Sequence, residues 1–186
     1  MLRFDSFSKL LSSGVRVGFV TGPTELIERI ELHTQTTMLH ASGLSQAVVS
    51  KLFDKWQSGG FLAHVDKVAE FYMKRRDAFV ASINMHLDGL VEFQTPTAGM
   101  FVWMKFVGIS EVPLSRAVEK NILMVPGSSF VPKEAPQDDK EGASPKERDG
   151  GFVRLSFSSA TTDEMDVACQ RLKELLQEEN RRNQKG

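Results

Sequence analysis

The sequence predicts an α/β protein, because short apolar segments of strand length alternate with longer segments of helical periodicity. Its 186 residues suffice for one large domain or two small ones with a buried core. Hydrophobic residues make up 41% of the chain and charged residues 25%, which is ordinary for a globular protein. We therefore expect a folded protein built from both strands and helices.

Two strands and a helix are expected at the start of the chain. Residues 1–4 predict a short strand, and residues 15–21 predict a buried strand, because apolar and small residues alternate there between glycines. The Gly22-Pro23 pair ends the second strand. Thr24 is the expected N-cap of the following helix, with Glu25 in its first turn.

Two further helices are expected in the middle of the chain. Residues 34–42 are polar or small and predict a loop. Residues 45–56 place apolar side chains at helical spacing, and this helix should end at Ser58-Gly59-Gly60. Residues 61–87 show a long amphipathic pattern whose charges lie mainly on one face. Its length suits a helix that connects a large domain to a small one.

The remaining chain predicts a sheet with short helices. Strands are expected over 91–93, 100–107, 122–125 and 152–158, and helices over 114–120 and from the expected N-cap Thr162 onward. Residues 133–151 are rich in Pro, Asp, Glu, Lys and Gly and contain almost no apolar residues. Such a segment cannot bury enough surface to offset its ordering entropy, so we expect a mobile surface insertion there.

The residues around Lys9 suit a cofactor that carries an aldehyde and a phosphate. A neutral lysine amine can condense with an aldehyde to form a Schiff base. The hydroxyls of Ser6 and Ser8 and the guanidinium of Arg16 can bind a phosphate through charge-assisted hydrogen bonds. Taken alone, the Ser-Phe-Ser-Lys tetrapeptide is weak evidence, because a lysine in a serine-rich loop is more often a solvated surface residue.

The longer pattern around Lys9 is more specific. It reads Ser-x-Ser-Lys-x-x-x-x-Gly-x-Arg-x-Gly, and this resembles the pyridoxal-phosphate lysine region of class I/II aminotransferases. Within that family the chain is most similar to the kynurenine/α-aminoadipate and aromatic amino acid aminotransferases. The segments that carry this likeness are Asp-Ser-Phe-Ser-Lys, Leu-Ile-Glu-Arg, Ala-His-Val-Asp, Ala-Gly-Met-Phe-x-Trp and Ser-Phe-Ser-Ser-Ala.

The resemblance implies an α/β fold of the type I pyridoxal-phosphate class. Residues 1–60 would be the C-terminal remnant of the large cofactor-binding domain, and residues 61–186 the connecting helix and the small domain. In the family a long N-terminal half supplies a phosphate loop, a ring-stacking aromatic residue and the carboxylate that pairs with the pyridine nitrogen. None of these maps onto this chain, which therefore looks like the C-terminal half of an enzyme.

The resemblance also implies a cofactor and a reaction. The cofactor would be pyridoxal 5′-phosphate, with Lys9 as its attachment point and proton shuttle, and with Ser6, Ser8 and Arg16 on its phosphate. The reaction would be transamination of an aromatic amino acid, kynurenine or 2-aminoadipate with 2-oxoglutarate. Amino acid and 2-oxo acid substrates are thus the expected small-molecule partners, and the complete protein is expected to be a homodimer.

Two further residues are candidates for substrate binding. Arg154 lies in an otherwise apolar strand, where a guanidinium needs an anionic partner. From the strand alone, an edge-strand arginine that faces water remains an alternative. The resemblance implies that Arg154 binds the substrate α-carboxylate through two parallel hydrogen bonds. Gly99 would let the backbone approach the substrate, although a simple turn glycine explains it equally well.

Three other functions remain open from the sequence. A pyridoxal-phosphate lyase or decarboxylase could use the same lysine, and amino transfer that depends on a keto acid would discriminate against it. An aminotransferase-like transcription regulator would need a basic helix-turn-helix, which is absent from these residues but could lie upstream of them. The chain could also be a catalytically incomplete fragment.

Composition argues against several classes of partner. The formal net charge of -1 gives no electrostatic reason to expect nucleic acid or an anionic membrane, and no apolar run is long enough to span a bilayer. The four histidines lack paired spacing with acids or thiols, so no metal site is expected. Cys169 is the only cysteine, which suits a reducing compartment. We expect a cytoplasmic protein, or a mitochondrial one if an N-terminal segment is missing.

Overall fold

The computed structural model describes residues 1–110, 112–131 and 151–183. The chain divides into two compact units, Met1–Glu70 and Phe71–Gly186, and each is considered by itself below. The expected domain boundary between residues 60 and 61 remains a prediction. The expected insertion over 133–151 lies outside the described residues, except for Gly151.

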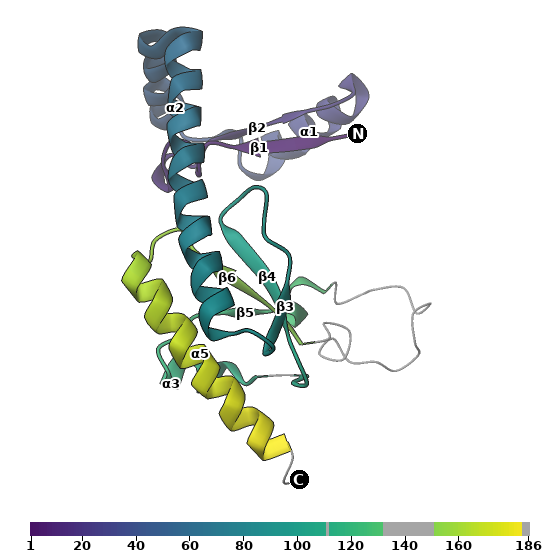
Figure 1. Cartoon of the computed structure of the whole chain (residues 1–186). Helices are drawn as coiled ribbons and strands as arrows, with labels where there is room; N and C mark the ends of the chain where they lie inside the picture. The colour runs from purple at the N-terminus through teal and green to yellow at the C-terminus, as the bar shows by residue number, and fades with distance from the viewer. Residues whose placement is uncertain (111, 132–150, 184–186) are drawn as a thin grey trace. The chain divides into compact units, whose positions relative to one another are not determined.

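The first unit begins with a two-stranded antiparallel ribbon (Figure 1). Strand β1 (Arg3–Ser6) pairs with β2 (Gly18–Thr21) in a register that places Arg3 opposite Thr21 and Ser6 opposite Gly18. A Cβ atom at Gly18 would lie 2.5 Å from the backbone oxygen of Asp5, so only glycine permits this close approach.

The expectation of a buried strand over 15–21 is wrong in two respects. The strand begins only at Gly18, because a short 3-10 helix, η1 (Ser13–Val15), comes before it. The Phe19 side chain is 49% exposed, because the ribbon has only two strands and the unit covers it incompletely.

Helix α1 (Thr24–Thr37) follows directly after the ribbon. Pro23 occupies its N-cap position, and no side chain caps the helix, so the expected cap at Thr24 is wrong by one residue. The helix also extends past the expected end into the predicted loop over 34–42. The hydroxyls of Thr36 and Thr37 donate hydrogen bonds to the carbonyl of His33, which satisfies a helix-terminal acceptor.

Helix α2 (Gly43–His86) runs from the first unit into the second. It is interrupted at Gln57, whose φ of 52° and ψ of -173° are not helical, so α2 consists of two helical stretches. The predicted pair of helices is therefore present, with the break one residue before Ser58-Gly59-Gly60. The boundary between the two compact units falls within the second stretch.

The second unit contains a four-stranded antiparallel sheet of order β3-β4-β6-β5. Its strands are β3 (Val91–Phe93), β4 (Phe101–Phe106), β5 (Val125–Pro126) and β6 (Phe152–Ser156). The strand expected over 122–125 is reduced to Val125–Pro126. Ile122 and Met124 are buried in the connection that precedes it.

Among the described residues, the long helices cover one face of this sheet and leave much of the other face exposed. Helix α5 (Thr162–Asn183) and the last turns of α2 lie on the same side of the sheet (Figure 1), while α3 (Leu114–Glu119) and the 3-10 helix η2 (Gly127–Phe130) follow β4 and β5. The core contains residues of two helices and two strands: Phe79, Ile83 and Leu87 of α2, Val102, Met104 and Phe106 of β4, Val153 and Leu155 of β6, and Cys169, Leu172 and Leu175 of α5. Burial raises the pKa of the Cys169 thiol to about 11.

A capping box starts α5. The backbone N–H of Glu164 donates to Oγ1 of Thr161, at 3.2 Å, and the backbone N–H of Thr161 donates to Oε2 of Glu164, at 2.6 Å. The N-cap is thus Thr161, and the expected cap at Thr162 is wrong by one residue. The hydrogen bonds from the backbone and hydroxyl of Thr161 hold the pKa of the Glu164 carboxyl below its usual range.

Among the described residues, no helix combines the length and the apolar character needed to cross a membrane.

Candidate functional site

Lys9 lies in a tight turn at the end of the β1–β2 ribbon. The backbone N–H of Phe7 donates to the carbonyl of Val17, at 3.0 Å, which extends the ribbon beyond Ser6, and the N–H groups of Leu10 and Leu11 both donate to the carbonyl of Phe7. The Phe7 ring packs 5.6 Å from that of Phe19, between ring centroids, and thereby anchors the turn. Lys9 is exposed, so its amine is accessible to a ligand.

Three of the predicted phosphate-binding residues meet beside this lysine. Nη1 of Arg16 donates to Oγ of Ser8, at 3.4 Å, and the backbone N–H of Ser8 donates to Oγ of Ser6, at 3.2 Å. Arg16 also donates to the carbonyl of Ser13. No carboxylate in the described part of the chain pairs with this guanidinium. One cation and two hydroxyls therefore share a small region, which fits a bound phosphate.

The backbone at Arg16 is unusual. Its φ of 51° and ψ of 39° lie in the left-handed region, where a residue other than glycine costs on the order of 1 kcal/mol. This conformation ends η1 and directs the Arg16 side chain back toward Ser8 and Ser13.

His64 lies beside the turn that bears Lys9, although the sequence did not identify it as part of the site. Its Nε2 lies 2.7 Å from the carbonyl oxygen of Leu10, so Nε2 carries the proton and donates to the residue after Lys9. The His64 ring stacks on Trp56 with 4.7 Å between centroids. The available signal was the segment Ala63-His64-Val65-Asp66, which contributed to the family resemblance without indicating a role for the histidine.

Arg154 lies on the face of the second unit's sheet that α2 and α5 do not cover. Its strand β6 lies between β4 and β5, so the alternative of an edge-strand arginine is wrong. The guanidinium carbon is 4.1 Å from the ring centroid of Phe101 and 4.7 Å from that of Phe130. Within the described residues, no carboxylate pairs with Arg154. Two aromatic rings thus hold a guanidinium whose anionic partner is not supplied by those residues.

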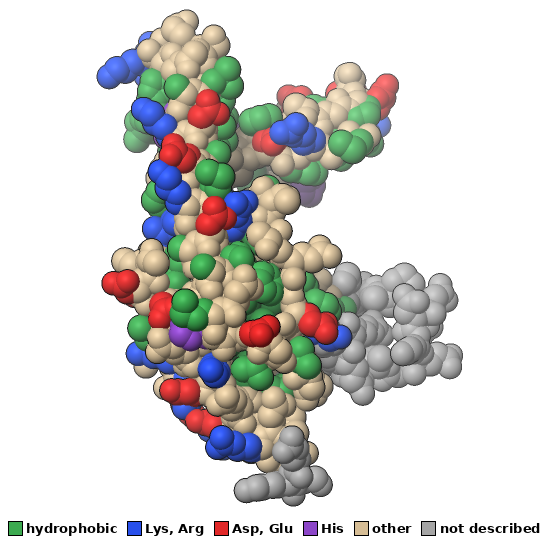
Figure 2. Space-filling model, in the orientation of Figure 1, with side chains coloured by type: hydrophobic (Ala, Val, Ile, Leu, Met, Phe, Trp, Pro, Cys, Tyr) green, Lys and Arg blue, Asp and Glu red, His purple; other side chains and the backbone are tan. Residues whose placement is uncertain are grey.

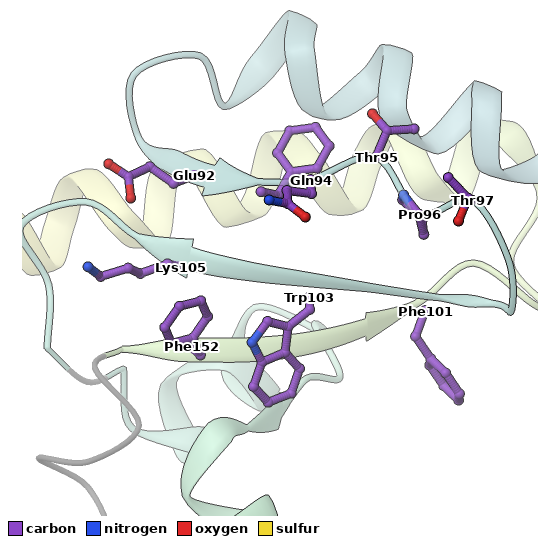
Figure 3. A pocket seen from close by; sticks show the side chains of 10 residues that line it. Glu92, Gln94, Thr95, Pro96, Thr97, Phe101, Trp103, Lys105 and Phe152 are labelled. Carbon is purple, nitrogen blue, oxygen red and sulfur yellow. The ribbon is translucent and has the colours of Figure 1, made fainter.

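A cavity of about 560 Å³ lies on the same open face, between the β3–β4 connection and β4. Figure 3 shows Thr95, Pro96 and Thr97 of the connection along one rim, and Trp103 and Lys105 of β4 along the other. Trp103 is the direct cross-strand neighbour of Arg154, and Phe101 contacts both the cavity and the Arg154 guanidinium. The cavity is therefore continuous with the surroundings of Arg154.

Gly99 precedes β4 in that connection. Its φ is +82°, and a Cβ atom added there would have no neighbour within 4 Å. The backbone conformation explains the glycine, and the open space leaves access to the backbone from outside. Its expected role near a substrate remains a prediction.

The predicted site residues form two groups. Ser6, Ser8, Lys9 and Arg16 belong to the first unit, whereas Gly99 and Arg154 belong to the second. The described side chains include no group of three or more His, Cys, Asp and Glu residues that could hold a metal ion.

Comparison with known proteins identifies relatives for nearly the whole chain. The family described as aminotransferase class I and II matches residues 2–172. The mitochondrial kynurenine/alpha-aminoadipate aminotransferase of Bos taurus is 46% identical over 181 residues, which cover 96% of this chain and 40% of the relative.

The fold of this chain is also similar to solved structures of aminotransferases. LysN, an alpha-aminoadipate aminotransferase of Thermus thermophilus in complex with N-(5′-phosphopyridoxyl)-L-leucine, matches with a TM-score of 0.79 and 25% identity, over 95% of this chain and 42% of LysN. The kynurenine aminotransferase of Pyrococcus horikoshii matches with a TM-score of 0.78 and 29% identity, over 96% of this chain and 41% of that enzyme. This chain thus spans about 40% of the length of the curated relatives that it matches.

Proposed function

This chain belongs to the class I and II aminotransferase family, and we propose that the complete protein transfers the amino group of an aromatic amino acid, kynurenine or 2-aminoadipate to 2-oxoglutarate. Its fold is that of the fold type I pyridoxal-phosphate aminotransferases, as the sequence predicted. The cofactor in this proposal is pyridoxal 5′-phosphate, which the family implies.

The cluster of Ser6, Ser8 and Arg16 beside Lys9 is the observation that supports this function most directly. The planar guanidinium and the two hydroxyls suit a phosphate dianion, which accepts charge-assisted hydrogen bonds from such groups. With the phosphate bound there, the accessible amine of Lys9 would hold the aldehyde carbon covalently. His64 would keep the turn in place through its bond to Leu10.

Arg154 and its aromatic neighbours suit the substrate α-carboxylate. Phe101 and Phe130 lie against the guanidinium carbon, and such cation–π contacts leave the N–H groups at its edge free to donate. A carboxylate would then bind through two parallel hydrogen bonds, which fixes its orientation as well as its position. Gly99 leaves room for the substrate to approach the backbone of the β3–β4 connection.

In the proposed mechanism, Lys9 moves a proton and Arg154 orients the substrate. When bound, the pyridoxal ring supplies an electron sink that lowers the cost of removing the substrate Cα proton. Nζ of Lys9, as the free amine, takes that proton and later returns it. Arg154 holds the carboxylate so that the Cα–H bond keeps one orientation, which converts the transfer into an effectively intramolecular step.

We propose that residues 1–186 alone do not complete this reaction. The relatives are much longer, since this chain covers 40% of the Bos taurus enzyme. The carboxylate that pairs with the pyridine nitrogen and the ring-stacking aromatic residue would come from the part of the relatives that this chain does not span. We also propose a homodimer for the complete protein, in the cytoplasm or in mitochondria, where the Bos taurus relative is found by its name.

Cofactor attachment is tested by reduction of the imine. Residues 1–186 are incubated with pyridoxal 5′-phosphate, reduced with borohydride and mapped by peptide mass, and we expect the pyridoxyl adduct on Lys9. Inorganic phosphate should compete, and Arg16→Gln should reduce labelling of Lys9. The exposed Lys51 and Lys67 serve as internal controls. Preferential labelling of either control lysine would refute the attachment site.

Substrate binding is tested at Arg154. Arg154→Lys keeps the charge and loses the two-point fork, so the affinity for 2-oxoglutarate should fall by about 2–4 kcal/mol, taking two charge-assisted bonds. Labelling of Lys9 by the cofactor should not change. Arg181→Lys, at an exposed position of α5, is the matched control. Loss of cofactor labelling with intact 2-oxoglutarate binding would assign Arg154 another role.

Catalysis is tested by amino transfer from kynurenine, 2-aminoadipate and aromatic amino acids to 2-oxoglutarate. A dependence on the keto acid separates a transaminase from a lyase or a decarboxylase. We expect residues 1–186 to be inactive and a protein of the relatives' length to be active. Turnover of about 1 per second or more by residues 1–186 would show that the additional part is dispensable.

A further inference from the structure

Two consecutive arginines of α2 donate to backbone carbonyls of two different loops. Nε of Arg75 donates to the carbonyl of Phe157, at 3.0 Å, and Nη2 of Arg75 donates to the carbonyl of Ala160. Nη1 of Arg76 donates to the carbonyl of Pro96, at 3.3 Å. These contacts join residues that are far apart in the sequence but lie within the second unit.

The two loops meet at the same end of the β4–β6 pair. Because these strands are antiparallel, the start of β4 lies beside the end of β6, with Phe101 opposite Ser156. The backbone N–H of Phe157 donates to the carbonyl of Met100, at 3.1 Å, and Oγ of Ser156 lies 3.4 Å from the same oxygen. Arg75 therefore fixes the chain as it leaves β6, and Arg76 fixes the chain before it enters β4.

The residues that surround Arg154 lie at this end of the sheet. Phe101, whose ring lies against the Arg154 guanidinium, is the first residue of β4. Pro96, which Arg76 holds, is on the rim of the neighbouring cavity (Figure 3). A shift of either loop would move Phe101 relative to Arg154 or change the shape of the cavity.

We propose that Arg75 and Arg76 are positioning residues for Arg154. They set the orientation of its guanidinium and the shape of the adjacent cavity by holding the chain at one end of the β4–β6 pair. The inference rests on the proposed function, in which Arg154 binds the substrate carboxylate.

The chemistry of the contacts explains why arginines are present. The carbonyls of Phe157, Ala160 and Pro96 belong to loops, so no strand partner donates to them and they need another donor. One planar guanidinium can donate to two carbonyls at once, whereas a lysine provides a single charged point. Arg75 is partly buried and lies 5.1 Å from the ring centroid of Phe71, which restricts its motion.

The same helix also contacts the turn that bears Lys9. His64 in α2 bonds to the carbonyl of Leu10 in the first unit, and Arg75 and Arg76 in α2 bond to the loops of the second. Within each unit, a side chain of α2 thus donates to backbone carbonyls close to the candidate site residues of that unit.

The test is a side-chain NMR measurement on residues 1–186. Because the Arg154 guanidinium lies against Phe101 and Phe130, ring currents should shift the resonances of its Cδ protons and Nε–H away from those of a free arginine. In Arg75→Gln and in Arg76→Gln we expect at least about half of this shift to be lost, because the strand ends are no longer held. The affinity for 2-oxoglutarate, read from the same resonances, should fall about tenfold.

Two matched variants complete the design. Arg181→Gln removes an exposed arginine of α5 and should leave the Arg154 resonances and the affinity unchanged. Arg75→Lys keeps the charge and can still reach one carbonyl, so it should lose less of the shift than Arg75→Gln. It also provides a folded protein if Arg75→Gln does not fold.

Each outcome decides the proposal. If the folded variants, Arg75→Lys included, keep the Arg154 shift and the affinity, the proposal is wrong. A lower unfolding temperature with unchanged Arg154 resonances would show a purely structural role and would also overturn it. If the wild type and Arg154→Gln bind 2-oxoglutarate equally, the proposed function of Arg154 fails. The ring-current shift requires no ligand and still decides whether Arg75 and Arg76 position that side chain.

Discussion

The two units of the chain differ in how completely they bury their apolar residues. Of the residues in Met1–Glu70, Val49 is the only buried hydrophobic one, whereas the second unit encloses a core drawn from α2, α3, α5 and the sheet. Figure 2 shows hydrophobic side chains on the surface of the first unit, and Phe4, Phe19 and Leu44 are among its exposed residues.

This difference shows that an apolar sequence pattern predicts a face that must be covered, but not whether the same unit supplies the residues that cover it. In the second unit, the apolar positions of α5 and β4 predict both a buried face and its partner, because the partner is part of the same chain. In the first unit, the same kind of pattern predicts a face that should be covered, but the residues of Met1–Glu70 do not themselves cover it. We infer that the cover in the first unit comes from the part of the relatives that this chain does not span.

The largest expected effect compares one substitution in the two units. Leu175 is 0% exposed and Leu44 is 78% exposed. Leu175→Ala should lower the free energy of unfolding by about 2–5 kcal/mol, because it leaves a cavity in the core. Leu44→Ala should change it by less than about 0.5 kcal/mol. Urea unfolding followed by circular dichroism measures both, and equal effects would contradict the contrast between the units.

Amide hydrogen exchange should resolve the same contrast along the backbone. We expect the amides of β4 and β6 to exchange about a hundredfold more slowly than those of β1 and β2, because opening the sheet exposes the core whereas opening the ribbon exposes little. Mass spectrometry or NMR on residues 1–186 provides the rates. Equal protection of the two strand pairs would show that the first unit is more firmly folded than its exposure indicates.

A smaller effect is expected at the helix starts. Thr161 caps α5 through a side-chain hydrogen bond, whereas Thr24 is already the first residue of α1 and caps nothing. Thr161→Ala should therefore lower the free energy of unfolding by about 1 kcal/mol, and Thr24→Ala by much less. Thermal unfolding of the two variants measures the difference. A larger loss at Thr24 would contradict the assignment of the caps.

The smallest effect concerns acid stability of the second unit. Hydrogen bonds from His86 and Ser82 hold the pKa of the Asp166 carboxyl below its usual range. Because the folded-state pKa is lower than that of the unfolded chain, ionised Asp166 stabilises the fold above about pH 4 and loses this effect as the pH falls through the folded-state pKa. Asp166→Asn should reduce the loss of stability below pH 4, and Asp88→Asn, at an exposed position, is the control.

Much of the fold could be predicted because the patterns are local. Leu172, Leu175 and Leu176 recur at helical spacing and are buried as expected. The break at Gln57 had no such signal, because glutamine rarely adopts a positive φ and the nearby glycines indicated a later position. The two predicted caps were each displaced by one residue, because cap geometry depends on hydrogen bonds that the sequence only indicates approximately.

The candidate site was predictable only where a motif identified it. Ser8 and Arg16 lie in one pattern, and the structure brings them together. His64 and Arg75 act through backbone carbonyls of residues far away in the sequence, and a carbonyl is the same chemical group in every residue. No local pattern of amino-acid types could therefore identify these two contacts.

The position of β6 in the sheet has a consequence for the order in which the protein forms during synthesis. β6 is the last strand of the described chain, yet it lies between β4 and β5, which the ribosome produces earlier. Until β6 has emerged, β4 and β5 have no strand between them and each presents an unpaired edge that another chain could join. Because the pairing of β4 with β6 also spans a long stretch of chain, the second unit should fold slowly for its size and largely after translation. A nascent chain halted before residue 152 should thus bind chaperones through the free edges of β4 and β5, and this binding should be lost once β6 has emerged and paired.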